Sequence, residues 1–430
     1  MSVGPGTSHR REAANRLFIG LTVGLVTGVS AGFGSAAFLH ALTWATETRV
    51  DRPWLLWLLP GAGLGIGLLR RAAGRATAGT NLLLDEFHTE EGDHDLLPDD
   101  AAPGGRVPFH IAPYVLLGSV TTHLFGGSGG REGAAVQIAA GLAAPARPAL
   151  ERAGRRSGTS PLHVRRLLVV AALAGGFGSV FGVPFAGTIF GTEALRRWRP
   201  RASEHLRTRI AEAVAFLPAA AVASFVGHIV TTRLGIHHTK PPALDHSVSM
   251  GIVVVAVASG LLARAFLAAH HGVHETLLRS RLSVVAWPMA GGALVVILTL
   301  LINTRAYLGL SLPLIDAALI GTAVPTGAFA LKLVFTAVTL GCGFPGGEVT
   351  PLLCMGACLG AALAGPLGGS PPLLAAVGMV ATWAAASNTP ISAAVMGAEL
   401  FGPFGLLLFL PMNVAATLVS GAKGVYRAQR

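Results

Sequence analysis

The chain has 430 residues, of which 52% are hydrophobic and only 12% are charged, against about 25% charged residues in a typical soluble domain. Its net charge of +11 could indicate a nucleic-acid partner, but the arginines gather at the ends of apolar segments. That placement is typical of cytoplasmic loops in membrane proteins and argues against a folded basic patch. We therefore expect an all-α polytopic membrane protein that binds no nucleic acid.

The chain is expected to form one membrane domain. Apolar stretches of roughly 20 residues, enough to span a bilayer, recur from residue 17 to residue 421. The first follows a basic tail, residues 1–16, and lacks a small-residue cleavage site, so we expect a retained helix and a cytoplasmic N-terminus. Residues 17–430 are predicted to hold two halves, about 17–210 and 211–426, with no appended soluble domain.

Basic clusters predict the topology of the first half. Arg70, Arg71 and Arg75 follow the second apolar segment, and a second cluster occupies residues 147–166. Both should be cytoplasmic, so residues 109–146 must leave and return, turning near 126–132. The acidic run between them, residues 85–100, is interpreted as a solvated loop because its spacing is irregular and it contains Gly and Pro.

A glutamate stands at that turn. Glu132 directly follows the glycine-rich stretch 126–131 and begins a predicted apolar helix. Ionisable groups at membrane depth are costly and mark ion or proton pathways. The free N–H groups of a helix N-terminus, together with the helix dipole, form an anion site. The sequence therefore predicts an ion-handling role for Glu132.

An internal repeat connects the two halves. Residues 184–193 and 390–399 share the pattern Pro-x6-Gly-x-Glu, and Gly129-Gly-Arg-Glu132 matches Pro345-Gly-Gly-Glu348. The segment 167–195 is expected to be a re-entrant pair broken at 181–184, where Gly and Pro interrupt the helix. Such halves are typical of transporters with inverted repeats, in which helix N-termini converge near the middle of the membrane.

Other polar residues in the apolar segments receive less specific interpretations. Cys342, Cys354 and Cys358 are expected to be packing residues, and His270, His271 and His274 the end of an interfacial helix; neither group predicts a metal site. Lys332 either biases the pathway toward anions, snorkels, or is paired locally. Glu193 and Glu399 are expected to be structural acids near helix ends. The sequence implies no cofactor.

Three motifs resemble the CLC family of anion channels and proton-coupled antiporters. They are Gly130-Arg-Glu-Gly133 with Val136-Gln137, the hairpin Val183-Pro-Phe-Ala-Gly187, and Asn388-Thr-Pro-Ile391 followed by Glu399. The resemblance covers nearly the whole chain and implies a CLC-type fold of two inverted repeats with broken and re-entrant helices. It also implies that Glu132 is the external gate, which occupies an anion position when ionised and carries a proton when protonated.

Two departures from the chloride pattern are similar to the bacterial fluoride branch, CLC-F. Gly347-Glu-Val-Thr-Pro351 replaces Gly-x-Phe-x-Pro, and residues 78–86 contain Asn81 and no proline. Fluoride is small and strongly hydrated, so hydroxyl or amide donors on Thr350 and Asn81 could replace its water. Glu348 would repel fluoride when ionised, but a desolvated carboxyl is protonated more readily and can then donate or pass a proton. The alternative for Glu348 is a helix-capping acid.

The resemblance completes a candidate site. Tyr426 resembles the family tyrosine whose hydroxyl contacts the central anion, with an interfacial tyrosine as the alternative. Glu132 and Glu348 are expected to gate and transfer protons. The anion-binding residues are expected to be Gly79, Thr80, Asn81, Gly130, Arg131, Gly133, Gly347, Val349, Thr350 and Tyr426.

The sequence supports three hypotheses of function. The first is a fluoride/proton antiporter that exports fluoride across the bacterial inner membrane, its partners being fluoride, protons, lipid and, by family resemblance, a second copy in a homodimer. The second is a chloride channel or chloride/proton antiporter with an unusual filter. The third is a membrane enzyme without transport, which the sequence disfavours because no Ser–His or twin-Asp pairing lies at membrane depth.

Overall fold

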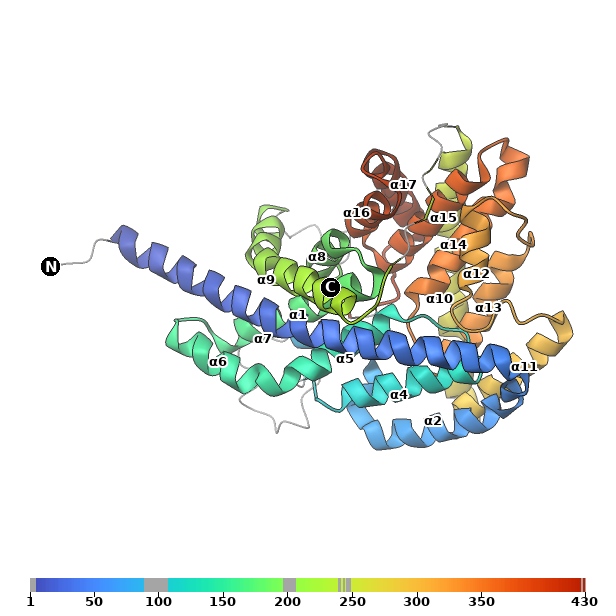
Figure 1. Ribbon diagram of the computed structural model, residues 1–430, viewed down its shortest axis with the longest axis horizontal. Coiled ribbons are helices and arrows are strands. Elements are labelled where there is room, and N and C mark those ends of the chain that lie inside the picture. Colours follow the sequence, from blue (N-terminus) through green and yellow to red (C-terminus); the bar gives the residue numbers. More distant parts are fainter. Residues whose placement is uncertain are drawn as a thin grey trace.

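The computed structural model describes residues 5–88, 107–195, 206–238, 241–242, 244, 249–426 and 428–429. These residues are almost entirely helical (Figure 1), and the β-type pairing found among them is a single isolated bridge, between Gly130 and Gly347. The helices are α1 (Pro5–Asp51), α2 (Leu59–Ala73), α3 (Thr80–His88), α4 (Ile111–Leu124), α5 (Glu132–Ala143), α6 (Arg147–Arg156), α7 (Pro161–Phe181), α8 (Pro184–Glu193), α9 (Leu206–Arg233), α10 (Gly251–Arg279), α11 (Trp287–Ile302), α12 (Leu312–Leu319), α13 (Ala328–Gly341), α14 (Val349–Leu367), α15 (Pro371–Ser387), α16 (Pro390–Phe401) and α17 (Gly405–Ser420). Short 3-10 turns occupy Pro53–Leu58, Gly74–Ala78 and Ala144–Ala146.

Six helical segments within the described ranges are long and apolar enough to cross a membrane. They are Ala13–Asp51, Pro53–Ala73, Pro161–Phe181, Ala213–Arg233, Gly251–Arg279 and Val349–Leu367. Several further helices, α4, α5, α8 and α16 among them, have only 10 to 14 residues and are too short to span a bilayer. The chain is therefore an all-α, multi-pass membrane protein with broken helices, as the sequence predicts.

Helix breaks occur at matched positions in the two halves. α7 ends at Gly182, whose φ of 71° is left-handed, and α8 restarts at Pro184. α15 likewise ends at the left-handed Asn388 (φ 58°), and α16 restarts at Pro390. The predicted break at 181–184 is confirmed. However, α7 is 21 residues long and can cross the membrane by itself, so α8 alone is the short, re-entrant member of that pair.

The two halves contact each other through α8 and α16. The carboxylate of Glu399, on α16, accepts hydrogen bonds from Phe185 N (3.0 Å) and Ala186 N (2.7 Å) at the start of α8. The carboxylate of Glu193, on α8, accepts bonds from Ile391 N (3.0 Å) and from Ser392 N (2.7 Å) at the start of α16. Each helix thus caps the other. These bonds agree with the interpretation of both glutamates as structural acids.

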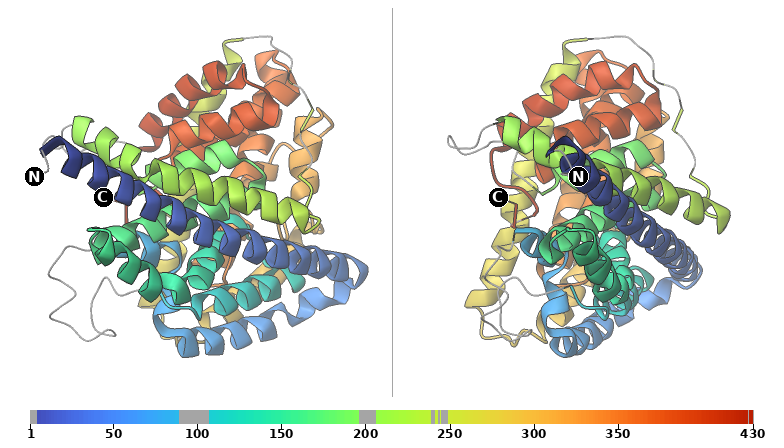
Figure 2. Two further views of the ribbon diagram at one scale, coloured as in Figure 1. Left: turned by 60° about the vertical axis from the view of Figure 1, so that its left-hand side comes forward. Right: turned by 90° about the vertical axis from the view of Figure 1, so that its left-hand side faces the viewer.

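The first helix is longer than the sequence predicts. α1 begins at Pro5, so residues 5–16 of the expected tail continue into the membrane helix, which lies beside α9 (Figure 2). Asn15 donates to Ser157 O, at the turn between α6 and α7, over 3.3 Å. The start of α1 therefore lies on the same side of the protein as the basic cluster at 147–166. The neighbouring basic residues 196–201 fall outside the described residues.

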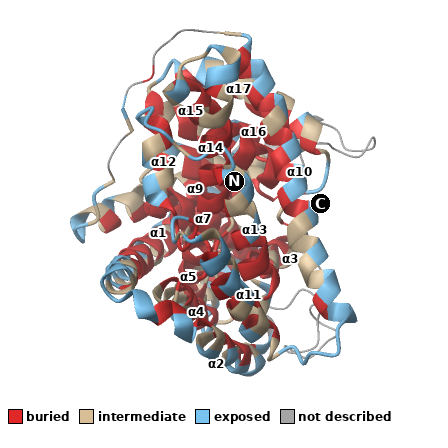
Figure 3. Cartoon of the chain, turned by 90° about the vertical axis from the view of Figure 1, so that its right-hand side faces the viewer, coloured by how far each residue is buried: buried red, intermediate tan, exposed pale blue. Residues whose placement is uncertain are grey.

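Small residues allow the most buried helices to approach closely. Buried residues concentrate on α7, α14 and α15, while exposed residues lie on the periphery (Figure 3). A Cβ atom on Gly356 of α14 would lie 2.1 Å from Gly378 O of α15, so this contact requires glycine. Cys342, Cys354 and Cys358 are buried free thiols, consistent with packing residues.

The expectation of a solvated acidic run is wrong at Glu86. Its side chain is only 3% exposed; it accepts Val107 N at 2.7 Å and pairs with Arg147 at 3.5 Å. The C-terminal end of α3 packs against the start of the next segment, where a carboxylate can be kept only with such partners. Residues 89–106, the remainder of the run, lie outside the described residues.

Candidate anion and proton pathway

A backbone bridge holds the starts of two helices together. Gly130 N donates to Gly347 O over 2.6 Å, and Gly347 N donates to Gly130 O over 2.9 Å. α5 begins two residues after Gly130 and α14 two residues after Gly347. A Cβ atom on Gly130 would lie 2.8 Å from Gly347 O, which leaves no room for a side chain. Since both N–H groups are used in the bridge, these glycines position the site and are not assigned as anion donors.

Glu132 lies on one side of this bridge, at the first position of α5. Its side chain is 1% exposed. Oε2 accepts Thr350 N at 3.0 Å and Arg131 N at 3.1 Å, and the hydroxyl of Thr350 donates to Oε1. The carboxylate of one half therefore occupies the N-terminal N–H and hydroxyl donors of α14 in the other half. These are the donors that would hold an anion at a helix N-terminus.

Glu348 lies at the matching position before α14, but its environment differs. The side chain makes no capping hydrogen bond to α14, which argues against the capping alternative. It lines a cavity of 340 Å³ together with Tyr426 and Thr80. We name it the inner cavity because its lining includes Arg70, which the sequence predicts to be cytoplasmic. A Cβ atom on Gly133 would lie 3.7 Å from both Glu348 Oε2 and Thr80 Oγ1, so these groups surround the start of α5.

The first motif and the C-terminal segment form another wall of the inner cavity. Gly79, with a positive φ of 67°, precedes α3, and Thr80 and Asn81 begin that helix. All three line the cavity. Gln137 donates to Thr80 Oγ1 (3.4 Å) and Gly133 O (2.9 Å), while Asn81 Oδ1 accepts Ala428 N (3.1 Å). Asn81 therefore anchors the segment that follows Tyr426 as well as facing the cavity.

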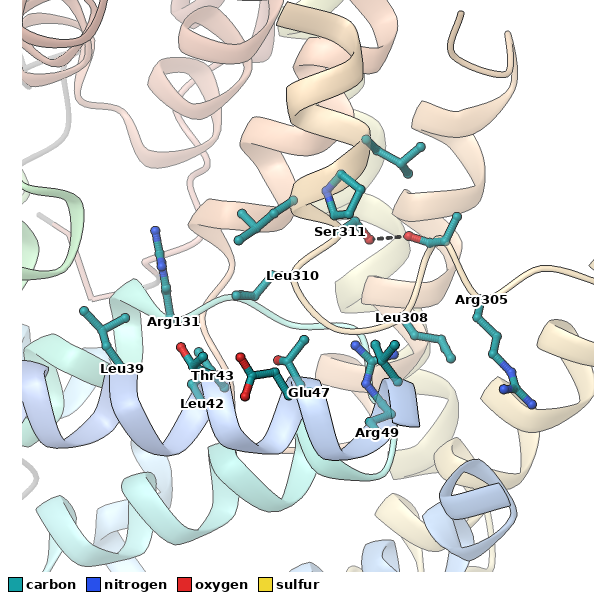
Figure 4. Close-up of a pocket in the computed structure, with 16 residues that line it drawn as sticks. Leu39, Leu42, Thr43, Glu47, Arg49, Arg131, Arg305, Leu308, Leu310 and Ser311 are labelled. Atoms are coloured by element: carbon teal, nitrogen blue, oxygen red, sulfur yellow. Dashed lines mark hydrogen bonds between the residues drawn. The ribbon is translucent and has the colours of Figure 1, made fainter. Parts of the chain in front are cut away.

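Arg131 lines a separate cavity of 660 Å³, which we name the outer cavity (Figure 4). Its Nε lies 3.6 Å from Glu132 Oε1. Thr80, Glu348 and Tyr426 thus line the inner cavity, Arg131 lines the outer cavity, and Glu132, which contacts both Thr350 and Arg131, lines neither. Val349 is buried as the first residue of α14, and its anion-binding role stays a prediction.

Comparison with known proteins agrees with this arrangement. Residues 66–421 match the family model for the voltage gated chloride channel. The chain belongs to the CLC family. A chloride/fluoride channel protein of Pseudomonas syringae is 38% identical over 413 residues, covering 93% of this chain and 84% of the relative. The ClC-type chloride channel ClcB of Salmonella typhi is 28% identical over 430 residues, covering 94% and 96%.

Solved structures show the same fold. The crystal structure of a CLC-type fluoride/proton antiporter superposes with a TM-score of 0.80 at 29% identity, covering 96% of this chain and 97% of that one. A slow cyanobacterial Cl⁻/H⁺ antiporter gives a TM-score of 0.72 at 18% identity, over 99% and 97%. The CLC fold predicted from the motifs is thus confirmed, and its inverted halves explain why one antiparallel bridge joins Gly130 to Gly347.

In this CLC protein, Lys332 is paired locally and does not snorkel. Its side chain is 0% exposed, and Nζ donates to Ser128 Oγ (2.9 Å), Gly309 O (2.7 Å) and Tyr307 O (3.2 Å). Ser128 belongs to the glycine-rich loop before Glu132. Lys332 therefore fixes both that loop and the loop preceding α12, and places a buried cation beside the start of the pathway.

Several residues of the inner cavity were not predicted. Arg70, Tyr114, His270, His271 and His274 line it, and Arg70 Nη1 also donates to Gly343 O over 3.1 Å. The three histidines lie near the end of α10 and line the cavity, while their interpretation as the end of an interfacial helix stays a prediction. Across the part of the chain that the structure describes, no group of three His, Cys, Asp or Glu side chains could hold a metal. The helical spacing of these histidines was visible in sequence, but the cavity they face was not.

Proposed function

We propose that this CLC protein is a fluoride/proton antiporter that exports fluoride from the cytoplasm. The observation that carries the proposal is the Glu132 carboxylate on the Thr350 N–H and hydroxyl. A carboxylate and a halide compete for such donors. When ionised, Glu132 fills the anion position and closes the path between the two cavities. When protonated, it loses much of its attraction to these donors and can leave, carrying its proton.

Glu348 supplies the second proton-active carboxyl in this proposal. It lines the inner cavity with Thr80 and Tyr426, whereas Glu132 lines neither cavity. A proton that enters through the inner cavity reaches Glu348 before it reaches Glu132, and one that enters from outside reaches them in the reverse order. A protonated Glu348 can also donate to an anion beside Tyr426, in place of repelling it.

Donor chemistry supports fluoride as the anion. Fluoride exchanges its hydration only for short, strong hydrogen bonds, and a site built of hydroxyl and N–H donors discriminates by such bonds. Thr350 provides both types, and Tyr426 and Thr80 provide two more hydroxyls along the cavity. The names of the Pseudomonas syringae relative and of the fluoride/proton antiporter structure both include fluoride, which also favours fluoride as the transported anion.

Chloride transport remains the second candidate, because the ClcB relatives are chloride channels that cover more than 90% of this chain. Flux from reconstituted liposomes distinguishes the two. Liposomes that contain the purified protein are loaded with equal concentrations of fluoride and chloride, and the efflux rates of both anions are recorded. Faster fluoride efflux, accompanied by proton movement against the pH gradient, supports the proposal. Faster chloride efflux overturns fluoride export, and fluoride efflux without proton movement overturns antiport.

We propose that the N-terminus is cytoplasmic and that the protein is a homodimer, as the sequence predicts. The start of α1 and the basic residues near α6 lie together, which supports a cytoplasmic N-terminus by the positive-inside rule. Residues 17–430 form the transport domain, and the protein works as a homodimer with one pathway in each subunit in the bacterial inner membrane. Labelling of a cysteine introduced at position 2 from the outside of intact cells would contradict this orientation.

A further inference from the structure

The outer cavity has features that fluoride transport does not require. It measures 660 Å³, within the range of pockets that hold small organic molecules. Much of its wall is apolar and comes from α1, from the segment before α12 and from the first turn of α12: Leu39, Leu42, Leu308, Leu310, Leu312 and Leu314. A hydrated inorganic anion gains nothing from such walls, because they offer it no hydrogen bonds.

Charged groups in the same cavity are predominantly basic. Arg49, Arg131 and Arg305 line it, against the single carboxylate of Glu47 (Figure 4). The Nε atom of Arg49 is buried, and within the described residues it has no hydrogen-bond acceptor. The Nε atom of Arg131 has only the 3.6 Å ion pair with Glu132. A buried N–H of a charged group is costly when it is unpaired. The cavity therefore presents guanidinium donors suited to a carboxylate or sulfonate.

The loop before α12, which forms the cavity wall near Arg49 and Arg305, is held in place by buried hydrogen bonds. Lys332 Nζ binds Tyr307 O and Gly309 O, and Ser311 Oγ donates to Ala306 O over 2.7 Å. Arg49 lies against this loop, since a Cβ atom on Gly309 would be 3.0 Å from Arg49 Nη2. A loop fixed by a fully buried lysine loses little entropy when a ligand binds, so the cavity is preorganised.

We propose that the outer cavity binds an organic anion with an apolar body, and that its occupant slows ion passage past Glu132. The anionic group pairs with Arg49 and Arg131, the exposed Arg305 adds a third positive charge in the cavity lining, and the apolar body covers the leucines. Because Arg131 Nε also lies 3.6 Å from Glu132 Oε1, the ligand is bound next to the gate. Binding does not depend on which inorganic anion is transported; only the effect on flux rests on the proposed function.

The test uses 2-naphthalenesulfonate, which is permanently ionised and cannot carry protons across the bilayer. Binding to the full-length protein in nanodiscs is measured by calorimetry, and fluoride efflux is measured from liposomes with the probe outside. Saturable binding and slower efflux are expected. Methanesulfonate, with the charge but no apolar body, and 2-naphthalenemethanol, with the body but no charge, should each bind at least about tenfold more weakly.

Variants locate the site. Arg305→Gln, at an exposed position, and Arg49→Gln should each weaken probe binding about tenfold, whereas Arg233→Gln, an exposed arginine at the end of α9 outside the cavity, should not. Equal binding of methanesulfonate, equal binding of the alcohol, or binding unaffected by both cavity variants overturns the proposal. If fluoride efflux is absent but Arg49-dependent binding persists, the proposed transport fails and the binding site stands. Binding without slower efflux overturns the effect on the gate.

Discussion

The starts of α5 and α14 carry the same kind of sequence, glycines followed by glutamate, yet their carboxylates have opposite surroundings. Glu132 is enclosed and accepts three hydrogen bonds from Arg131 and Thr350. Glu348 faces a cavity and caps nothing. The bridge between Gly130 and Gly347 treats both segments alike, so the difference arises from the residue two positions after each glutamate. Thr350 supplies donors to Glu132, whereas the corresponding residue after Glu132, Ala134, has no side-chain donor to offer Glu348. The inverted repeat thus provides two carboxylates at similar positions, and the hydroxyl of Thr350 contributes to the difference between their hydrogen-bond surroundings.

The largest effect is expected from substitution of Glu132, the enclosed carboxylate. In Glu132→Gln, the side chain can no longer be ionised or carry a proton, so fluoride-driven proton movement in liposomes should fall at least ~100-fold, the contribution typical of a positioned proton carrier. Fluoride flux should persist, uncoupled from protons. Arg131→Gln is unsuitable as a control because Arg131 touches the gate, so Glu47→Gln, an exposed acid of the outer cavity, serves instead. Coupled proton flux in Glu132→Gln would contradict the gate assignment.

Glu348→Gln tests the cavity side. The amide cannot release a proton but keeps a neutral donor of the same shape, so proton flux should drop by about 10- to 100-fold while fluoride binding changes by less than about threefold. Calorimetry with fluoride and a pH electrode on the same preparation measure the two quantities. Loss of fluoride binding together with proton flux would mean that the carboxylate has a different role from a proton carrier.

Thr350→Val removes the hydroxyl that distinguishes the two sides. Without this donor to a charged acceptor, worth about 1.5–3 kcal/mol, fluoride affinity should fall about tenfold or more, and preference over chloride should decrease because chloride depends less on short hydrogen bonds. Thr382→Val is the matched control, since its buried hydroxyl has no hydrogen-bond partner within the described residues. An unchanged fluoride/chloride flux ratio in Thr350→Val would exclude the hydroxyl as a selectivity element.

The smallest effect belongs to the other pair of matched glutamates. Glu193→Ala removes the cap from α16 and should lower unfolding free energy by about 1–2 kcal/mol, seen as a lower melting temperature in detergent, with the fluoride/chloride flux ratio unchanged. Glu275→Ala, exposed on α10, is the stability control. A changed flux ratio in Glu193→Ala would show that the α8–α16 pair belongs to the pathway.

Much of this architecture can be predicted from sequence because its signals are local. Gly182 with Pro184, and Asn388 with Pro390, state where helices break. The repeated Gly–Glu motif predicts that two helix starts meet. Features that depend on side chains from distant segments cannot be predicted in this way: the burial of Glu86 requires Arg147, which is 61 residues away. The outer cavity escapes prediction for the same reason, since Arg49 and Arg305 are brought together only by folding.

The glycine bridge also limits how the protein can move. Two hydrogen bonds, of 2.6 and 2.9 Å, join the backbones of the two halves, and a side chain on either glycine would collide with the opposite segment. The two halves are therefore hydrogen-bonded to each other directly beside both glutamates. Under the proposed function, we expect transport to proceed by rotation of a few side chains while these two hydrogen bonds stay intact. A covalent tether between the two halves should then leave the turnover rate intact.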